Sequence, residues 1–185
     1  MGNDAELIAD TRCGTGESPV WVVDEQALYW ADIPTGRLWR WKNGELKHWQ
    51  GDEMLACMAR SADGSGWIAG MESGVFRLTP QTDGRLAGER LAGVEHDRQG
   101  MRFNDGRCDR QGRFWAGTML MDMGAAAPVG RLYRHSSAEG LREVLDGFIT
   151  PNGLGFSPDG RTMYLSDSHP QVQAIWAFDY DTDSG

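Results

Sequence analysis

Three side chains that carry oxygen donors occupy similar places in the sequence, just ahead of short strand-like runs. They are Glu17 in GESPVW, Asn104 in FNDGRC and Asn152 in PNGLGF. A carboxylate and two amide oxygens brought together make a hard-oxygen site, which suits Ca²⁺, Mg²⁺ or Mn²⁺ and accepts Zn²⁺ when positions stay open for water. Taken singly, Glu17 is an ordinary surface acid and the two asparagines are ordinary turn residues. The metal hypothesis therefore depends on a fold that brings the three together.

A fourfold repeat supplies such a fold. Short aromatic-rich runs recur as LYWAD (28–32), GWIAG (66–70), FWAG (114–117) and MYLSD (163–167). Turn residues precede each run, and an alternating run follows each of them: GRLWRW, GVFRLT, GRLYRH and QAIWAFDY. Alternation with period two indicates half-buried strands joined by hairpins. With the run before each turn, every unit has three to four strands, which is the unit of a β-propeller blade.

The repeat places the three candidate ligands in one register. Each precedes the third position of its aromatic run by 11 to 13 residues, at the start of the presumed inner strand. Successive inner strands of a propeller surround one axis, so equivalent residues converge there. In the second unit the equivalent position is near Leu55, which is apolar. A stacked β-solenoid and a four-bladed ring are the structural alternatives.

Composition agrees with a single all-β domain over residues 1–185. Hydrophobic residues make up 40% of the chain, and 25 Gly and 7 Pro punctuate them, so helices should be few. The net charge is −9 and no basic run could follow a phosphate backbone, which argues against nucleic acid as a partner. No apolar stretch has the length of a membrane helix and the start lacks a signal peptide pattern, so we expect a cytoplasmic protein without a membrane partner.

The remaining special residues favour structural roles. The three cysteines, Cys13, Cys57 and Cys108, lack CxxC spacing, and we expect reduced, structural thiols. The four histidines form no metal-binding or triad pattern, which gives a histidine zinc site or a Ser-His triad little support. Four aromatic residues are expected to pack between blades rather than stack on a ligand: Trp21, Trp30, Trp67 and Trp115.

Together these segments resemble the SMP-30/gluconolactonase/regucalcin family, which includes luciferin-regenerating enzyme. The matching segments run in family order through the chain: GESPVW, YWADIPTGRLWRW, RFNDGRCDRQGRFWAGTM, PNGLGFSPDG and AFDYD. The resemblance implies a six-bladed propeller, of which about four blades are covered here. It also implies one divalent metal ion (Ca²⁺, Zn²⁺, Mn²⁺ or Mg²⁺) at the channel mouth and hydrolysis of sugar lactones to aldonic acids.

Roles for individual residues follow from the same resemblance. It implies that Glu17 and Asn152 are metal ligands and that Arg102 and Asn104 bind substrate near the metal. Asp122, in TMLMDMG, falls where the family often has an acid facing substrate hydroxyls, although the surrounding loop departs from the family pattern. Paired Arg102 donors could hold the lactone oxygens, and a bound cation could polarise its carbonyl and activate water.

The family also has a third metal ligand, an Asp usually proposed as the base, in a later blade. We expect that residue beyond Gly185, with about two of six blades absent, so the chain is either a fragment or naturally short. A partial propeller exposes an apolar blade face, so the isolated chain should be poorly soluble or oligomeric. The oligomeric state of the protein itself stays open.

Three functions are consistent with this pattern. A metal-dependent lactonase acting on a small-molecule sugar lactone leads, and a calcium-binding regulatory propeller without turnover would use the same metal site. The third is an interaction scaffold, or an inactive relative, in which the polar residues at the mouth only complete turns. The sequence selects neither the lactone nor the metal.

Overall fold

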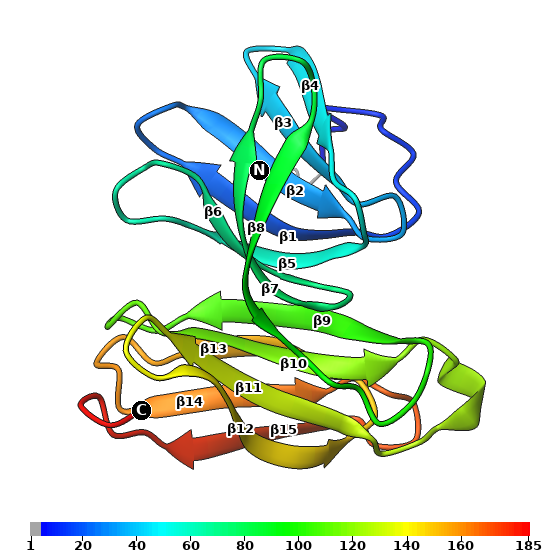
Figure 1. Cartoon of the computed structure of the whole chain (residues 1–185), viewed down its shortest axis with the longest axis vertical. Helices are drawn as coiled ribbons and strands as arrows, with labels where there is room; N and C mark the ends of the chain where they lie inside the picture. Colours follow the sequence, from blue (N-terminus) through cyan, green and yellow to red (C-terminus); the bar gives the residue numbers. More distant parts are fainter. Residues whose placement is uncertain (1–4) are drawn as a thin grey trace.

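The computed structural model describes residues 5–185, and it contains four antiparallel sheets (Figure 1). We call these sheets blades 1 to 4 in chain order. Blade 1 contains β1 (Gly16–Val22), β2 (Ala27–Asp32), β3 (Arg37–Lys42) and β4 (Glu45–Gln50). Blade 2 contains β5 (Leu55–Arg60), β6 (Trp67–Met71), β7 (Gly74–Pro80) and β8 (Leu86–Gly93).

Blade 3 contains β9 (Met101–Cys108), β10 (Phe114–Leu120), β11 (Gly130–Ser136) and β12 (Gly140–Phe148). Blade 4 contains β13 (Pro151–Phe156), β14 (Thr162–Asp167) and β15 (Ala174–Asp179). One short 3₁₀ helix, η1 (Met123–Ala125), is the only helix within residues 5–185, and it is far too short to cross a membrane. Within each blade the strands pair in sequence order, which confirms the predicted propeller blades.

Glycine turns set the hairpins that the sequence predicted. Gly64, Gly112 and Gly160 lie between the first and second strands of blades 2, 3 and 4, with φ of 72°, 82° and 76°. That left-handed region is costly for residues with a side chain, so glycine closes these turns without strain. The apolar runs on either side then pair as adjacent strands.

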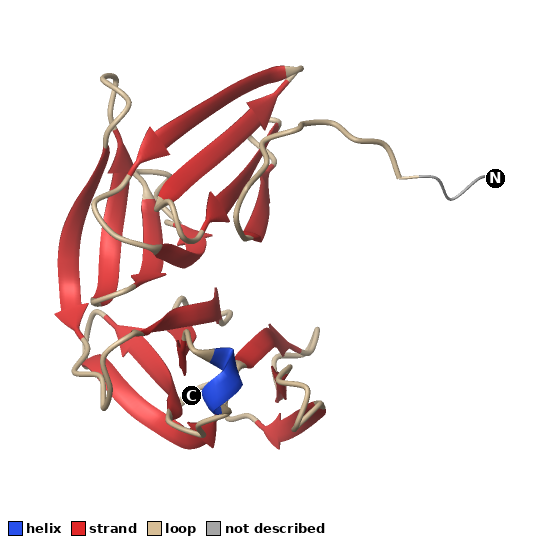
Figure 2. Cartoon of the chain, turned by 90° about the vertical axis from the view of Figure 1, so that its right-hand side faces the viewer, coloured by secondary structure: helices blue, strands red, loops and turns tan. Residues whose placement is uncertain are grey.

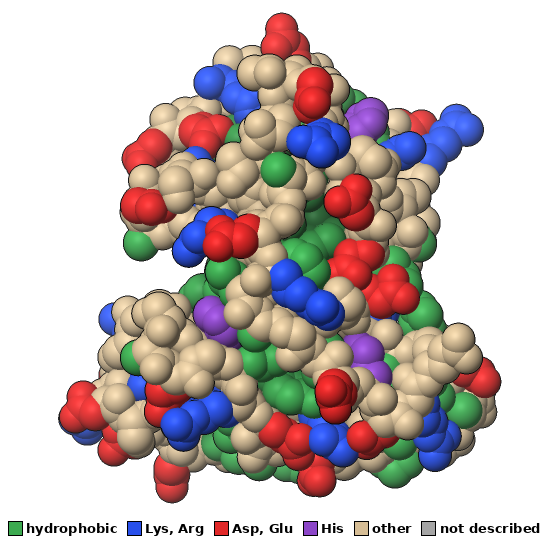
Figure 3. Space-filling view, viewed as in Figure 1, with side chains coloured by type: hydrophobic (Ala, Val, Ile, Leu, Met, Phe, Trp, Pro, Cys, Tyr) green, Lys and Arg blue, Asp and Glu red, His purple; other side chains and the backbone are tan. Residues whose placement is uncertain are grey.

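The hydrophobic core is divided into layers between successive blades. The inner strands β1, β5, β9 and β13 contact one another in order, and the blades follow an arc rather than a closed ring (Figure 2). Blades 1 and 2 form one half and blades 3 and 4 the other, with apolar side chains gathered where the halves meet (Figure 3). The Tyr29 and Trp67 rings are 4.8 Å apart between blades 1 and 2, and Trp115 contacts Phe156 and Tyr180 between blades 3 and 4.

The four tryptophans assigned to packing between blades lie on two different faces. Trp67 and Trp115 are buried between blades, as expected. Trp30 stacks on Trp39 of its own sheet at 6.1 Å, and Trp21 is 48% exposed. By strand alternation both point to the face of blade 1 that is turned away from blade 2, so their packing against another blade stays a prediction.

Strand β15 is the last strand of blade 4 among the described residues. There it pairs only with β14, and its Ile175 is 77% exposed. The expectation that the isolated chain associates or is poorly soluble stays a prediction.

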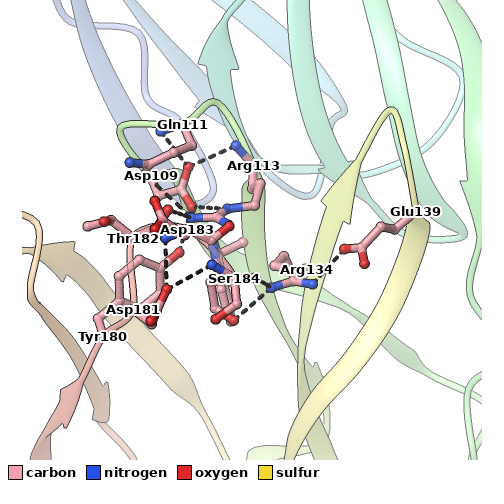
Figure 4. Close-up of polar contacts among 12 residues, drawn as sticks. Asp109, Gln111, Arg113, Arg134, Glu139, Tyr180, Asp181, Thr182, Asp183 and Ser184 are labelled. Atoms are coloured by element: carbon pink, nitrogen blue, oxygen red, sulfur yellow. Dashed lines mark hydrogen bonds and ion pairs between the residues drawn. The ribbon is translucent and has the colours of Figure 1, made fainter.

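A polar network joins blade 3 to the end of blade 4 (Figure 4). The buried Asp109 carboxylate accepts hydrogen bonds from the Arg113 side chain and the Tyr180 hydroxyl, both at 2.5 Å. Arg113 also donates to the carbonyl oxygens of Thr182 and Asp183. Burial alone would raise the pKa of Asp109, but the hydrogen bonds from Tyr180 and Arg113 lower it overall. Burial and Asp109 raise the pKa of Tyr180 to about 12.

Candidate metal and substrate site

Each of the four inner strands contains a β-bulge near its start. In blade 1 the pairing jumps between Glu17 and Val20, and in blade 4 between Asn152 and Gly155. Blades 2 and 3 have the corresponding irregularity. A bulge redirects side chains and increases the local twist of a strand. The repeated bulge therefore sets the direction of side chains at one end of the arc.

Buried carboxylates hold the chain where it enters β1 and β13. Asp167 accepts hydrogen bonds from the backbone nitrogens of Ile149 at 2.7 Å, Thr150 at 3.0 Å and His169 at 3.1 Å. In blade 1, Asp32 accepts from the Thr15 nitrogen at 3.2 Å and from a threonine hydroxyl. These carboxylates fix the loops that lead directly to Asn152 and Glu17.

The bulges also tie neighbouring blades together. Ser18 accepts a hydrogen bond from the Met58 nitrogen at 3.0 Å, which joins blade 1 to blade 2. Asp105 accepts one from the Leu154 nitrogen at 3.0 Å, which joins blade 3 to blade 4. The site end of each inner strand is thus braced by the next blade as well as by its own sheet.

The strand pairing places the three candidate ligands at the bulges of their inner strands. Glu17 pairs with Ala31 and Asn152 with Ser166, which are equivalent residues of β2 and β14. In blade 3 the pairing jumps between Phe103 and Gly106, so Asn104 lies inside the bulge. The shared register of the three side chains stays a prediction. In the second unit Leu55, near the expected position, precedes the bulge of β5 and is fully buried.

Four of the five predicted site residues meet at one cavity of ≈ 360 Å³. Glu17, Arg102, Asn104 and Asn152 all line it, from three different blades. Its remaining lining residues are Thr15, Ile33, Pro34, Met54, Met119, Met121, Met123 and Thr150. The cavity therefore combines a cluster of polar groups with a wall of four methionines.

Arg102 and Asn104 are positioned by direct contacts. The Arg102 guanidinium donates from one nitrogen to the carbonyl oxygen of Phe103 at 2.7 Å and to Oδ1 of Asn104 at 2.9 Å. The Asn104 amide nitrogen donates to the Pro151 carbonyl oxygen at 3.0 Å. Burial lowers the pKa of Arg102, and the Glu17 carboxylate opposes that shift. The guanidinium stays positive at neutral pH and keeps further N–H groups for an oxygen-rich ligand.

The donor set at the cavity fits a hard cation. The Asn152 amide nitrogen donates to Ser168 Oγ at 3.4 Å, and this leaves the amide oxygen Oδ1 available to bind a cation. Glu17 is exposed and is the only carboxylate lining the cavity among residues 5–185. Within the same residues no three His, Cys, Asp or Glu side chains cluster as a metal site. The described chain therefore offers one carboxylate and amide oxygens, with coordination positions left for water or substrate.

Asp122 has a different local role from the other predicted residues. It is exposed, it caps η1, and its carboxylate accepts a hydrogen bond from the Gly124 nitrogen at 3.1 Å. The flanking residues Met121 and Met123 line the cavity, whereas Asp122 itself does not. Its assignment to substrate hydroxyls stays a prediction.

Sequence reasoning missed the threonines and methionines of the cavity. Thr15 and Thr150 each stand two residues before a predicted metal ligand, in TGE and TPN, and this shared spacing was a usable signal. The methionines carried a weaker signal, since only the alternation in MLMDM indicated a common direction. Met54 comes from the loop before β5 and left no such trace.

Comparisons with known proteins identify relatives for nearly the whole chain. A family model described as SMP-30/gluconolactonase/LRE-like region matches residues 15–185. The 6-deoxy-6-sulfogluconolactonase of Pseudomonas putida is 40% identical over 176 residues, which are 92% of this chain and 57% of that protein. The L-arabinolactonase of Azospirillum brasilense is 37% identical over 181 residues, 95% of this chain and 58% of that protein.

Solved structures show the same fold. Regucalcin from Agrobacterium tumefaciens, described as a calcium-binding protein, superposes with a TM-score of 0.82 at 26% identity, covering 94% of this chain and 57% of that one. A gluconolactonase from Xanthomonas campestris gives a TM-score of 0.72 at 22% identity, covering 91% of this chain and 59% of that one. The chain thus spans a little under three fifths of the length of these proteins.

Proposed function

Because the chain belongs to the SMP-30/gluconolactonase/LRE-like family, we propose that the whole protein hydrolyses a sugar lactone with the help of one divalent metal ion. Water adds to the lactone carbonyl, the ring C–O bond breaks, and the product is the open-chain aldonic acid. The observation that carries the proposal is the convergence of Glu17, Asn152, Asn104 and Arg102 on one cavity. Two curated relatives are named lactonases, which supports this reaction class.

Glu17 and Asn152 would hold the metal ion. A bound divalent cation supplies Lewis-acid polarisation of a carbonyl and lowers the pKa of water. A carboxylate with a neutral amide oxygen leaves net positive charge on the ion, which favours both effects. Ca²⁺, Mg²⁺, Mn²⁺ and Zn²⁺ all accept such a donor set, so the identity of the ion is part of the test.

Arg102 and Asn104 would bind and orient the lactone. Arg102 retains N–H groups beyond the two hydrogen bonds it makes, and a planar guanidinium can hold two neighbouring oxygens at once. Holding the ring in one orientation removes much of the entropic cost of bringing carbonyl and nucleophile together. The four methionines that line the cavity would offer an apolar surface to the carbon skeleton of the ring. The general base is expected in the later blade, as the family resemblance implies.

The test is an assay of the complete protein on aldonolactones. We expect acid release with gluconolactone, arabinolactone or a related ring, its loss after treatment with a chelator, and its return with one of the four metals. Glu17→Gln should abolish the metal-dependent rate, while Glu45→Gln on the exposed edge of blade 1 is a control that should not. No hydrolysis of any aldonolactone with any of these metals would refute the proposal.

A calcium-binding protein without turnover is the second candidate. It uses the same metal site, and the regucalcin structure described as calcium-binding supports it. Calcium binding that Glu17→Gln removes, in a complete protein that hydrolyses no lactone, would favour this alternative. If Glu17→Gln changed neither binding nor turnover, the polar mouth would only complete turns. A cytoplasmic location stays part of the sequence-based expectation.

A further inference from the structure

A loop of blade 3 supplies two of the four methionines that line the cavity. This site loop, residues 121–126, contains η1, and its Met121 and Met123 side chains line the cavity while remaining 39% exposed. The Met121 nitrogen donates to the Gly100 carbonyl oxygen at 2.9 Å. The loop ends at Ala126, whose φ of 45° is left-handed. A short exposed loop with few anchors of its own needs contacts from elsewhere to hold one position.

Blade 4 supplies those contacts through a single residue of the site loop. The His169 ring nitrogen Nε2 lies 3.1 Å from the Met123 carbonyl oxygen, across 46 positions in sequence. The Thr150 hydroxyl donates to the Met123 sulfur at 3.4 Å. Both His169 and Thr150 are buried, and Asp167 holds the backbone nitrogens of both. The two contacts therefore come from side chains whose backbone is held in place by Asp167.

The hydrogen bonds of His169 determine which nitrogen carries the proton. The Gln171 backbone nitrogen donates to Nδ1 of His169 at 3.2 Å, so Nδ1 is the acceptor. The neutral imidazole then carries its hydrogen on Nε2, which donates to the Met123 carbonyl oxygen. The same carbonyl accepts the Ala126 nitrogen at 3.2 Å and so closes the turn of η1.

The buried aspartate and threonine that hold the loop before the inner strand occur in blade 1 without a histidine. Blade 1 has the same arrangement of buried aspartate and threonine, with Asp32 and Thr15, but Pro34 stands at the position of His169. Proline has no side-chain donor. The ring of His169 is thus an addition to blade 4, and among residues 5–185 its one hydrogen bond outside its own turn is with the site loop.

We infer that His169 is a positioning residue that clamps the site loop and thereby sets substrate fit. The substrate half of this inference rests on the proposed function, whereas the clamp does not. Holding Met123 keeps Met121 and Met123 in the lining of the cavity that also contains Arg102, and it holds the turn that Asp122 caps. Release of the clamp loosens the pocket around the ring and weakens binding more than turnover.

Two isosteric variants separate the clamp from the turn. His169→Gln retains a donor near Nε2 but loses the acceptor near Nδ1, whereas His169→Asn retains the acceptor and loses the donor. We expect hydrogen exchange of amides 121–126, measured without substrate, to be about tenfold faster in His169→Asn and near wild type in His169→Gln. In the complete protein, His169→Asn should raise KM about fivefold with kcat within about twofold, and His169→Gln should restore KM.

The outcomes are distinguishable from those of the proposed function. Equal exchange in both variants, or protection in His169→Asn that matches the wild type, would overturn the clamp. Faster exchange with an unchanged KM would overturn its role in substrate fit, and a protein without lactonase activity but with the exchange pattern would leave the clamp intact. His48→Asn, at an exposed histidine of β4, is the control and should change neither measurement.

Discussion

Blades 1 and 4 share one supporting frame, a buried aspartate that holds the loop before the inner strand, but they present different side chains to the cavity. Asp32 and Asp167 are both buried and both hold the loop before the inner strand. The frame ends in a bulge that carries Glu17 in blade 1 and Asn152 in blade 4. A negative and a neutral oxygen donor thus sit on equivalent supports. The supports are therefore the same in blades 1 and 4. The charge of the candidate ligand and the contacts to the site loop differ between them.

The largest expected effect concerns the buried carboxylates themselves. Asp167 accepts from three backbone nitrogens, and Asp32 from one backbone nitrogen and one hydroxyl. We expect Asp167→Ala to lower the free energy of unfolding by about 4 kcal/mol and Asp32→Ala by about 2 kcal/mol, since each unpaired buried group costs about 1–3 kcal/mol. Denaturant unfolding measures both. Equal losses would contradict this difference and show that the two aspartates contribute equally to the free energy of unfolding.

A smaller effect is expected on the pH dependence of stability, at the polar contact between blades 3 and 4. The low pKa of Asp109 means that its charged form stabilises the folded chain. This stability is fully present above the unfolded pKa, near 3.8, and is lost as the pH falls through the lower folded pKa. The raised pKa of Tyr180 gives the opposite limb: stability is present below its ordinary pKa of 10.0 and is lost as the pH rises toward about 12.

Unfolding measured across this pH range, with Tyr180→Phe alongside, tests that join. The variant should lack the alkaline limb that Tyr180 contributes, and its acid limb should be smaller and end at higher pH, because Asp109 loses one donor and its folded pKa moves back toward 3.8. In blade 1 the Tyr29 hydroxyl donates to Glu25 at 2.5 Å, so Tyr29→Phe is a matched control at the other join. An acid limb that Tyr180→Phe leaves unmoved would argue against this network.

The smallest effect comes from the backbone of the bulge. Gly153 in blade 4 has φ of 60°, and its counterpart Ser18 in blade 1 has φ of 54°. We expect Gly153→Ala to cost about 1 kcal/mol, because a residue with a side chain is disfavoured in the left-handed region. Gly155→Ala should be close to neutral, since an added Cβ there meets nothing within 4 Å. Thermal unfolding of the pair checks the difference, and equal stabilities would contradict it.

Much of the fold followed from local patterns. Aromatic runs and glycine turns predicted the hairpins because strand pairing between adjacent segments is a local property. The faces of Trp21 and Trp30 were not predictable in this way, since alternation defines two faces but not which one a neighbouring blade covers. The bulges were also hidden, because one extra residue in a strand leaves no periodic signal in the sequence.

The candidate site also has a part that local sequence patterns predicted and a part that they did not. Glu17, Asn104 and Asn152 were found because a propeller repeats its inner strands around one axis. The site loop was not, because its position depends on a contact between Met123 and His169 that are far apart in sequence. Irregular loops held by long-range hydrogen bonds leave little periodic signal.

Calorimetric titration of the complete protein with Ca²⁺, Mg²⁺, Mn²⁺ and Zn²⁺ measures whether Glu17 and Asn152 bind one metal ion on equivalent supports. We expect Glu17→Gln to weaken binding of the preferred ion by about 100-fold or more, since a hard cation loses its anionic ligand. Glu17→Gln combined with Asn152→Asp should recover most of that affinity, because the carboxylate is moved to the matching support in blade 4. Unchanged affinity in Glu17→Gln, or no recovery in a folded double variant, would refute a shared metal site.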